Sequence, residues 1–318
     1  MNSRNQSLDV LRGVAILLVM CDHFPLIPLM KAGWIGVDLF FVLSGFLISS
    51  LLFQEFKSTG EIRIGRFILR RGFKIWPAFY CYLSLALFLT RWASPSISLR
   101  GFAASSLFLM SYFPHLGPLY LGPMWSLSVE EHFYICLPLL LLLLLALSKG
   151  KANHFASLPA LFAALTIACL VGRLIAPISS GIIANRASHL RVDALFCGVL
   201  LGYLYHFRPF WFQRLRSSWL LIGAAVLIAP ACILLEESFF IRTIGLTMTL
   251  AGFGILVAWA VQRQPSGYLA RALAWIGFYS YSIYLWHLCL AFPFVCPSSR
   301  ALRWLSGSRW FWPSRSGL

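Results

Sequence analysis

The chain alternates long apolar segments with short polar ones. The apolar segments fall at 8–30, 34–53, 75–91, 125–147, 155–177, 190–207, 219–236, 239–261 and 274–295. Each is close to the roughly 20 residues that cross a bilayer, whereas a further apolar piece at 101–113 is shorter and is expected to be re-entrant or interfacial. Backbone groups in lipid must be satisfied within the segment, so the long segments are predicted to be helices. The pattern predicts an all-α polytopic transmembrane helix bundle of about nine to ten spans, with no soluble domain.

Composition and charge agree with this interpretation. Hydrophobic residues make up 59% of the chain and charged residues 11%, against roughly 25% charged in a soluble domain. The net charge of +16 comes from basic residues between apolar segments, which predicts a cytoplasmic N-terminus and contact with membrane lipids and no nucleic-acid partner. The cysteines form no CxxC pair and the histidines are dispersed, so we expect no metal site.

The first apolar segment carries ionisable residues at an unexpected depth. Arg12 and His23 are eleven positions apart, which places them within about 20° of one helix face and roughly 16 Å apart. Charged groups in a membrane usually face a polar cavity and act there, and histidine is a suitable general base. A histidine bonded between helices, with Arg12 reaching the lipid heads, explains the same spacing.

The second segment contains Asp38, which we expect at a similar depth to His23 and treat as a catalytic candidate. Its small residues, Gly33, Gly36, Ser44 and Gly45, are instead interpreted as positions of close helix packing.

Three basic residues, Arg70, Arg71 and Lys74, fall within about one helical turn before the third segment. Guanidinium groups bind phosphate oxygens. The residues alone allow a nucleotide-like donor or anionic lipid, and they favour lipid.

Polar and aromatic residues gather at the start of the 125–147 segment. Trp125, Ser126 and Glu130 fit a sugar site, although a helix cap explains the serine and one acid equally well. In the last segment an aromatic belt accounts for Tyr284 but leaves His287 unexplained.

Six ordered motifs carry a family resemblance: "LDVLRGVAILLVMCDHF", "GVDLFFVLSGFLIS", "RRGFKIWPAFY", "WSLSVEEHFY", "HLRVDALFCGVLLGYL" and "YSYSIYLWH". Together they resemble the acyltransferase family 3 integral-membrane proteins, which include O-antigen and exopolysaccharide O-acetyltransferases. The resemblance implies a bacterial inner-membrane O-acyltransferase without a bound cofactor. Its donor would be cytoplasmic acyl-CoA, most simply acetyl-CoA, and its acceptor a hydroxyl of a surface or secreted glycan, free or lipid-linked.

The resemblance also implies roles for individual residues. It implies that Arg12 and His23 are essential, that the basic motif matches Arg70, Arg71 and Lys74, and that the motif carboxylate is Glu130. With the candidates above, the predicted catalytic residues are His23, Glu130 and Asp38. The predicted donor-binding residues are Arg12, Arg70, Arg71 and Lys74, and the predicted acceptor-binding residues are Trp125, Ser126, Tyr284 and His287. The chain departs from the family pattern at Lys74, His132 and Asp22, where Arg, Gln and another residue are usual.

The predicted organisation is a transmembrane domain at 5–295 and a basic, aromatic tail at 296–318. The tail holds four Arg, no acid and no span-length apolar run, whereas the family continues with a further span, so we expect a truncated or altered end. Two alternatives to the enzyme stay open at this stage. One is a transporter or exporter of a glycan or polar solute, whose intramembrane charges form a pathway, and the other is a non-catalytic remnant.

Overall fold

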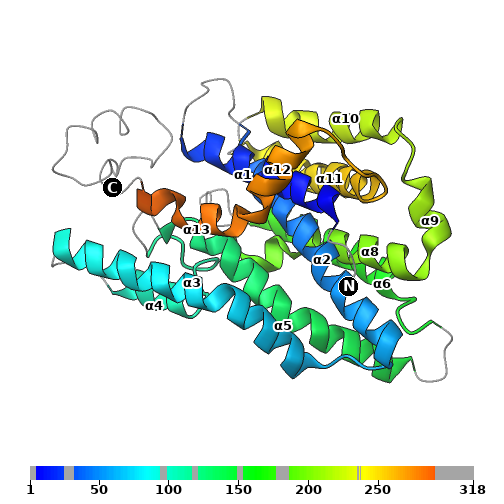
Figure 1. Cartoon of the computed structure of the whole chain (residues 1–318), viewed down its shortest axis with the longest axis horizontal. Coiled ribbons are helices and arrows are strands. Elements are labelled where there is room, and N and C mark those ends of the chain that lie inside the picture. Colours follow the sequence, from blue (N-terminus) through cyan, green and yellow to red (C-terminus); the bar gives the residue numbers. More distant parts are fainter. Residues whose placement is uncertain are drawn as a thin grey trace.

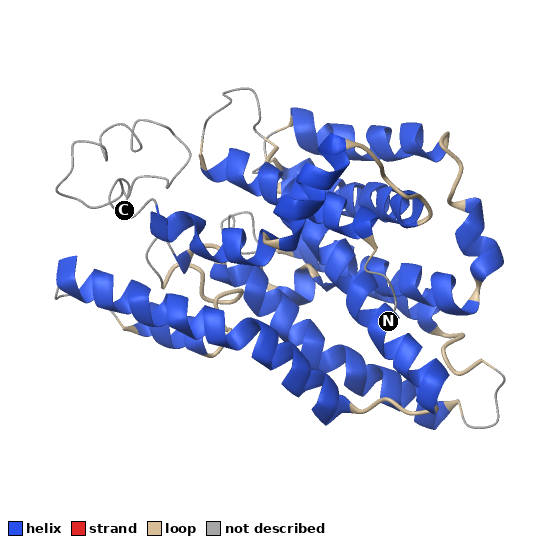
Figure 2. Cartoon of the chain, viewed as in Figure 1, coloured by secondary structure: helices blue, strands red, loops and turns tan. Residues whose placement is uncertain are grey.

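In the computed structural model, helices joined by loops make up the described part of the chain, as Figures 1 and 2 show. It describes residues 5–24, 32–93, 99–116, 121–148, 153–176, 186–234, 236 and 238–290. The elements are α1 (Gln6–His23), α2 (Ile35–Thr59), α3 (Ile64–Ala93), α4 (Arg100–Ser106), α5 (Met124–Leu147), α6 (Leu158–Ile175), η3 (Ser188–Leu190), α8 (Val192–Phe207), α9 (Pro209–Arg214), α10 (Leu220–Ile233), η4 (Ile241–Gly245), α11 (Leu246–Val261), α12 (Tyr268–Phe278) and α13 (Ser280–Leu290).

Four described helices are long and apolar enough to cross a membrane: α2, α5, α6 and the continuous Ile241–Val261 helix formed by η4 and α11. Three shorter apolar helices, α8, α10 and α12, accompany them. Their outward faces are apolar, and Leu139, Leu143 and Leu147 on α5 are each more than half exposed. A row of exposed leucines one turn apart is suited to lipid contact. The all-α membrane bundle is therefore confirmed, whereas the number of spans stays a prediction.

The structure differs from the sequence expectation in two places. The described part of the segment 274–295 is not one continuous helix, because α12 ends at Phe278 and α13 begins at Ser280. The basic residues between the second and third apolar segments, at 54–74, lie mostly in helices and not in a loop. The helix α2 ends at Thr59, Gly60 caps it with φ 74°, and α3 starts at Ile64. Charged residues end an apolar run without ending a helix, since Lys and Arg are good helix formers. The 101–113 segment holds only the short α4, and the tail at 296–318 lies outside the described residues.

Close helix packing depends on glycine, as the small-residue pattern predicts. A Cβ at Gly45 of α2 would lie 1.9 Å from the Leu195 carbonyl oxygen of α8. From the other side, a Cβ at Gly198 would lie 2.2 Å from the Val42 carbonyl oxygen. The backbones of α2 and α8 therefore touch, which fixes the position of α2 beside the remaining site helices.

We expect Gly198→Ala to destabilise the protein by about 1–3 kcal/mol, because the added methyl would meet rigid backbone. The measurement is thermal unfolding of the detergent-solubilised protein. Gly223→Ala is the matched control, since a Cβ there meets nothing within 4 Å. Equal stability of the two variants would contradict the close α2–α8 contact.

The candidate site residues come from several helices, of which α2 and α13 contact α1 directly. Figure 1 shows α1 and α12 crossing in the upper part of the view, while α3 and α5 run along the lower part. Contacts join α1 to α2, α12 and α13, and join α5 to α2, α3 and α8. Polar side chains on the inner faces of α1, α3, α5 and α13 are consequently brought together.

Candidate active site

Two histidines from distant parts of the chain face each other. His23 lies on the last turn of α1 and His287 on α13, and their ring centroids are 4.9 Å apart in an edge-to-face arrangement. The Nδ1 of His23 lies 3.0 Å from the Val19 carbonyl oxygen, and the Nδ1 of His287 lies 2.6 Å from that of Tyr284. A carbonyl only accepts, so each Nδ1 carries the hydrogen and each Nε2 holds a lone pair. Within the described part of the chain, the buried His287 Nε2 has no hydrogen-bond partner.

Two arginines, Arg12 and Arg71, lie toward the other end of α1, together with the acids Asp9 and Glu130. The Arg12 Nε donates to the Ser280 Oγ at 3.2 Å, and Arg12 interacts electrostatically with Arg71 and Glu130. Ser280 begins α13 and His287 lies near its end, so α1 and α13 run side by side in the same direction. Eleven residues of α1 separate its arginine from its histidine by roughly 16 Å.

Glu130 is linked to Arg71 through a tyrosine. Its Oε1 accepts a hydrogen bond from the Ser44 Oγ at 2.9 Å, and its Oε2 accepts one from the Tyr134 hydroxyl at 2.5 Å. The Arg71 Nη2 in turn donates to that hydroxyl at 2.8 Å, and the guanidinium lies 4.6 Å from the Tyr134 ring centroid. This chain of charge-assisted bonds holds the carboxylate and the guanidinium in a fixed relation.

Ser126 and Tyr284 connect the two ends. Their hydroxyl oxygens are 2.5 Å apart, and the Tyr284 ring centroid is 5.8 Å from that of His287. On α5 the residues Ser126, Glu130 and Tyr134 recur every four positions and so lie on one helix face. A polar column results, and its members are Arg12, Arg71, Tyr134, Glu130, Ser44, Ser280, Ser126, Tyr284, His287 and His23.

Trp125 lies beside this column at its histidine end. Its ring packs against Phe41 with centroids 6.0 Å apart. The guanidinium carbons of Arg186 and Arg191 each lie 5.7 Å from the Trp125 ring centroid. Of the predicted acceptor residues, Ser126, Tyr284 and His287 are joined by direct contacts, whereas Trp125 is turned to the adjoining face of α5, beside Arg186.

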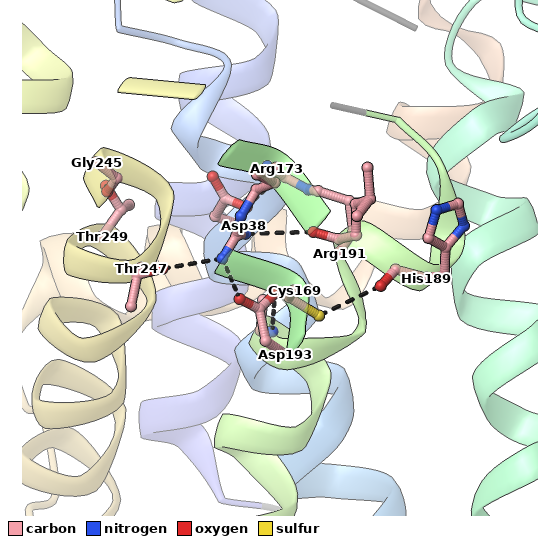
Figure 3. Close-up of polar contacts among 11 residues, drawn as sticks. Asp38, Cys169, Arg173, His189, Arg191, Asp193, Gly245, Thr247 and Thr249 are labelled. Carbon is pink, nitrogen blue, oxygen red and sulfur yellow. Dashed lines mark hydrogen bonds and ion pairs between the residues drawn. The ribbon is translucent and has the colours of Figure 1, made fainter. Parts of the chain in front are cut away.

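Asp38 lies in a separate layer of buried ion pairs (Figure 3). It is 2% exposed and pairs with Arg191. One step further, Arg173 and Asp193 pair at 2.7 Å, both almost fully buried, and Arg173 also donates to the Thr247 Oγ1 at 2.9 Å. The structure therefore gives Asp38 a cationic partner outside the column, and its catalytic role stays a prediction.

The three basic residues of α3 that were predicted to bind the acyl donor face different surroundings. Arg71 points into the column, whereas Arg70 and Lys74 are exposed on another face of α3. Successive residues of a helix are turned by 100°, so neighbours in sequence face different surroundings. The contact with the column that the structure gives for this group is that of Arg71 with Tyr134.

Comparison with known proteins assigns the family. A sequence model described as an acyltransferase domain matches residues 5–313. The chain belongs to this acyltransferase family. It is 30% identical over 305 residues to the peptidoglycan O-acetyltransferase OatA of Listeria monocytogenes, covering 88% of this chain and 48% of that protein.

Other relatives are similar to this acyltransferase domain at a comparable identity and coverage. The protein named "Putative peptidoglycan O-acetyltransferase YrhL" of Bacillus subtilis is 30% identical, with 88% of this chain and 47% of the relative covered. The protein named "Putative O-acetyltransferase SACOL0978" of Staphylococcus aureus is 29% identical, with 89% and 50% covered. The chain thus spans about half the length of the curated relatives it matches, and no solved structure matches it. Two of these names refer to peptidoglycan. None refers to the O-antigen of lipopolysaccharide, which is the acceptor of some members of the family that the motifs resemble.

Several residues of the acyltransferase domain's column were missed by sequence reasoning. Ser44 was assigned to packing, and Tyr134 and Ser280 were not singled out. The four-residue spacing of Ser126, Glu130 and Tyr134 is a signal that would have found the tyrosine. No comparable signal marks Ser280, whose role depends on the approach of α13 to α1.

We expect Tyr134→Phe to lower the activity of the domain about tenfold, because it removes the hydroxyl that joins Arg71 to Glu130. The measurement is the initial rate of acyl transfer, normalised to protein in the membrane. Tyr205→Phe is the control, since Tyr205 is 47% exposed on α8. An unchanged rate for Tyr134→Phe would show that the link does not matter.

Proposed function

We propose that this domain transfers an acyl group from acyl-CoA to a glycan hydroxyl at the membrane. The observation that carries the proposal is the polar column. It has guanidinium groups at one end, and at the other two histidines whose Nε2 atoms have no hydrogen-bond partner among the described residues. Family membership and the names of the relatives support the reaction class.

The donor would enter at the basic end. Arg12 and Arg71 face the column there, and they would bind the phosphates of acyl-CoA. The exposed Arg70 and Lys74 would attract the donor during its approach. The pantetheine arm is long and flexible, so the thioester would reach along the column toward the histidine end.

The chemistry follows from the tautomer of His23. Its Nε2 would accept the proton of the acceptor hydroxyl, and the oxygen would attack the thioester carbonyl carbon. A C–O bond forms, the C–S bond breaks, and the leaving thiolate takes the proton from the imidazolium. A covalent acyl-imidazole would use the same nitrogen. We assign Glu130 the role of positioning Arg71 through Tyr134, since its oxygens are both engaged.

The acceptor would bind at the histidine end, near Trp125, Ser126, Tyr284 and His287. The relatives named as peptidoglycan O-acetyltransferases favour a bacterial cell-wall or surface glycan as acceptor. The positive-inside rule favours the basic end of the column on the cytoplasmic face of the inner membrane, with the N-terminus inside and about nine to ten spans.

The test uses a strain that lacks the gene, complemented with the wild-type gene or with an empty vector. NMR of the purified cell-wall and surface glycans would report O-acyl esters and the amount of each glycan. We expect esters only in the complemented strain, with equal amounts of glycan in both. If the glycan itself fails to appear without the gene, the protein is an exporter and not an acyltransferase.

A further inference from the structure

Arg186 is a cation at the histidine end that neither the sequence motifs nor the reaction above employs. It lies in the segment just before η3, outside the helices. Its guanidinium carbon is 5.7 Å from the Trp125 ring centroid, and it interacts electrostatically with His23, Asp22 and Tyr284. It therefore lies near the proposed acceptor-binding residues, beside Trp125 of α5.

The two arginines that flank Trp125 differ in how their charge is balanced. Arg191 pairs directly with Asp38. Among the described residues, no hydrogen bond or ion pair is given for Arg186, whose charge is balanced by Glu236, Tyr284 and Asp22 through electrostatic interaction. Burial lowers the pKa of the Arg186 guanidinium from its ordinary value. A partly buried cation without a direct counter-charge is stabilised by an anion that enters the site.

The adjacent groups complete a site for one kind of molecule. The Nε2 atoms of His23 and His287 are acceptors that suit a sugar hydroxyl. A guanidinium suits a carboxylate or a phosphate, which it binds through two parallel hydrogen bonds.

We propose that Arg186 binds a negatively charged substituent, a carboxylate or a phosphate, of the glycan that receives the acyl group. The proposal rests on the proposed function, because it concerns the acceptor of that reaction. Arg186 would be a specificity-determining residue: it would hold the charged group while the neighbouring hydroxyl meets the histidine pair.

Binding is tested without the donor, on the full chain in detergent. The probes are tetragalacturonate, which carries carboxylates, maltotetraose 1-phosphate, which carries a phosphate, and neutral maltotetraose, and affinity is followed by the shift in thermal unfolding. We expect tighter binding of a charged probe, and Arg186→Gln is expected to weaken that binding about tenfold or more, because a hydrogen-bonded charge is lost. Which charged probe binds identifies the substituent.

The controls separate this role from others. Arg208→Gln removes an exposed arginine remote from the column and should change no affinity. Arg186→Lys retains the charge but not the two-pronged geometry, so an intermediate affinity is expected, and this variant carries the test if Arg186→Gln does not fold. Equal weakening for charged and neutral probes, or no weakening at all, would overturn the proposal.

Acyl transfer measured on the same probes distinguishes the two proposals. Charge-selective binding that depends on Arg186, without acyl transfer from acetyl-CoA to any glycan, would defeat the proposed function and leave the anion site in place. Transfer with equal kcat/KM for charged and neutral acceptors would retain the function and reject the site. A loss of kcat shared by all acceptors in Arg186→Gln would instead assign the arginine to the reacting oxyanion.

Discussion

The His23→Ala variant is expected to lose acyl transfer by about 10²–10⁴-fold, which is the contribution of a positioned general base. The Nδ1 hydrogen of His23 is held by the Val19 carbonyl, so the basic nitrogen is fixed at Nε2. Alanine removes that nitrogen. Among the described residues of the column, His287 is the other base near the end of α1. The ester signal of the complemented deletion strain is the measurement.

His115→Ala is the matched control, because His115 is exposed and lies outside the column. It should restore the ester fully, and immunodetection should find both variants in the membrane in equal amounts. Acylation retained by His23→Ala would reject the mechanism, and retention by that variant but not by His287→Ala would transfer the role of base to the second histidine.

The second large effect is expected in the buried ion-pair layer. Asp193→Ala should destabilise the protein by about 3–5 kcal/mol, because it leaves the Arg173 charge buried without its counter-charge. The pair is 2.7 Å apart, with both side chains 1% exposed. Thr247 is a remaining partner of the guanidinium but carries no charge. Thermal or denaturant unfolding of the solubilised protein measures the loss.

Replacing both partners tests the cause. A double variant, Arg173→Met with Asp193→Leu, should recover most of the stability, since apolar residues of similar volume remove the uncompensated charge. Glu61→Ala is the surface control, because its pair with Arg63 is more than half exposed and should contribute roughly 0–1 kcal/mol. A double variant as unstable as Asp193→Ala would show that the hydrogen bonds, and not the charge balance, sustain this layer.

Much of the architecture follows from the sequence alone. Apolar runs separated by basic residues require helices in a membrane, because lipid offers no partner for an open backbone. The spacing of Arg12 and His23 puts both on one face of α1, and the structure engages them with the same neighbouring helix, α13. The glycines of α2 likewise predict a close contact with another helix, which the structure shows with α8.

The relations between helices were decided only by the tertiary structure. Hydropathy gives the period of a helix but not which helix its polar face meets. The pairing of His23 with His287, of Asp38 with Arg191, and of Arg12 with Ser280 joins residues more than 150 positions apart.

The same reason explains why short stretches of sequence did not predict every feature of the site. Arg70 and Arg71 are neighbours in sequence, yet only Arg71 enters the column, because one residue along a helix turns the side chain by 100°. The break between α12 and α13 lies at Tyr279, beside Ser280 and Ser282, within the apolar segment predicted at 274–295. Sequence thus determined the all-helical class and the spacing of residues along each helix. Packing determined where helices break and which polar faces meet, since both depend on contacts between distant segments.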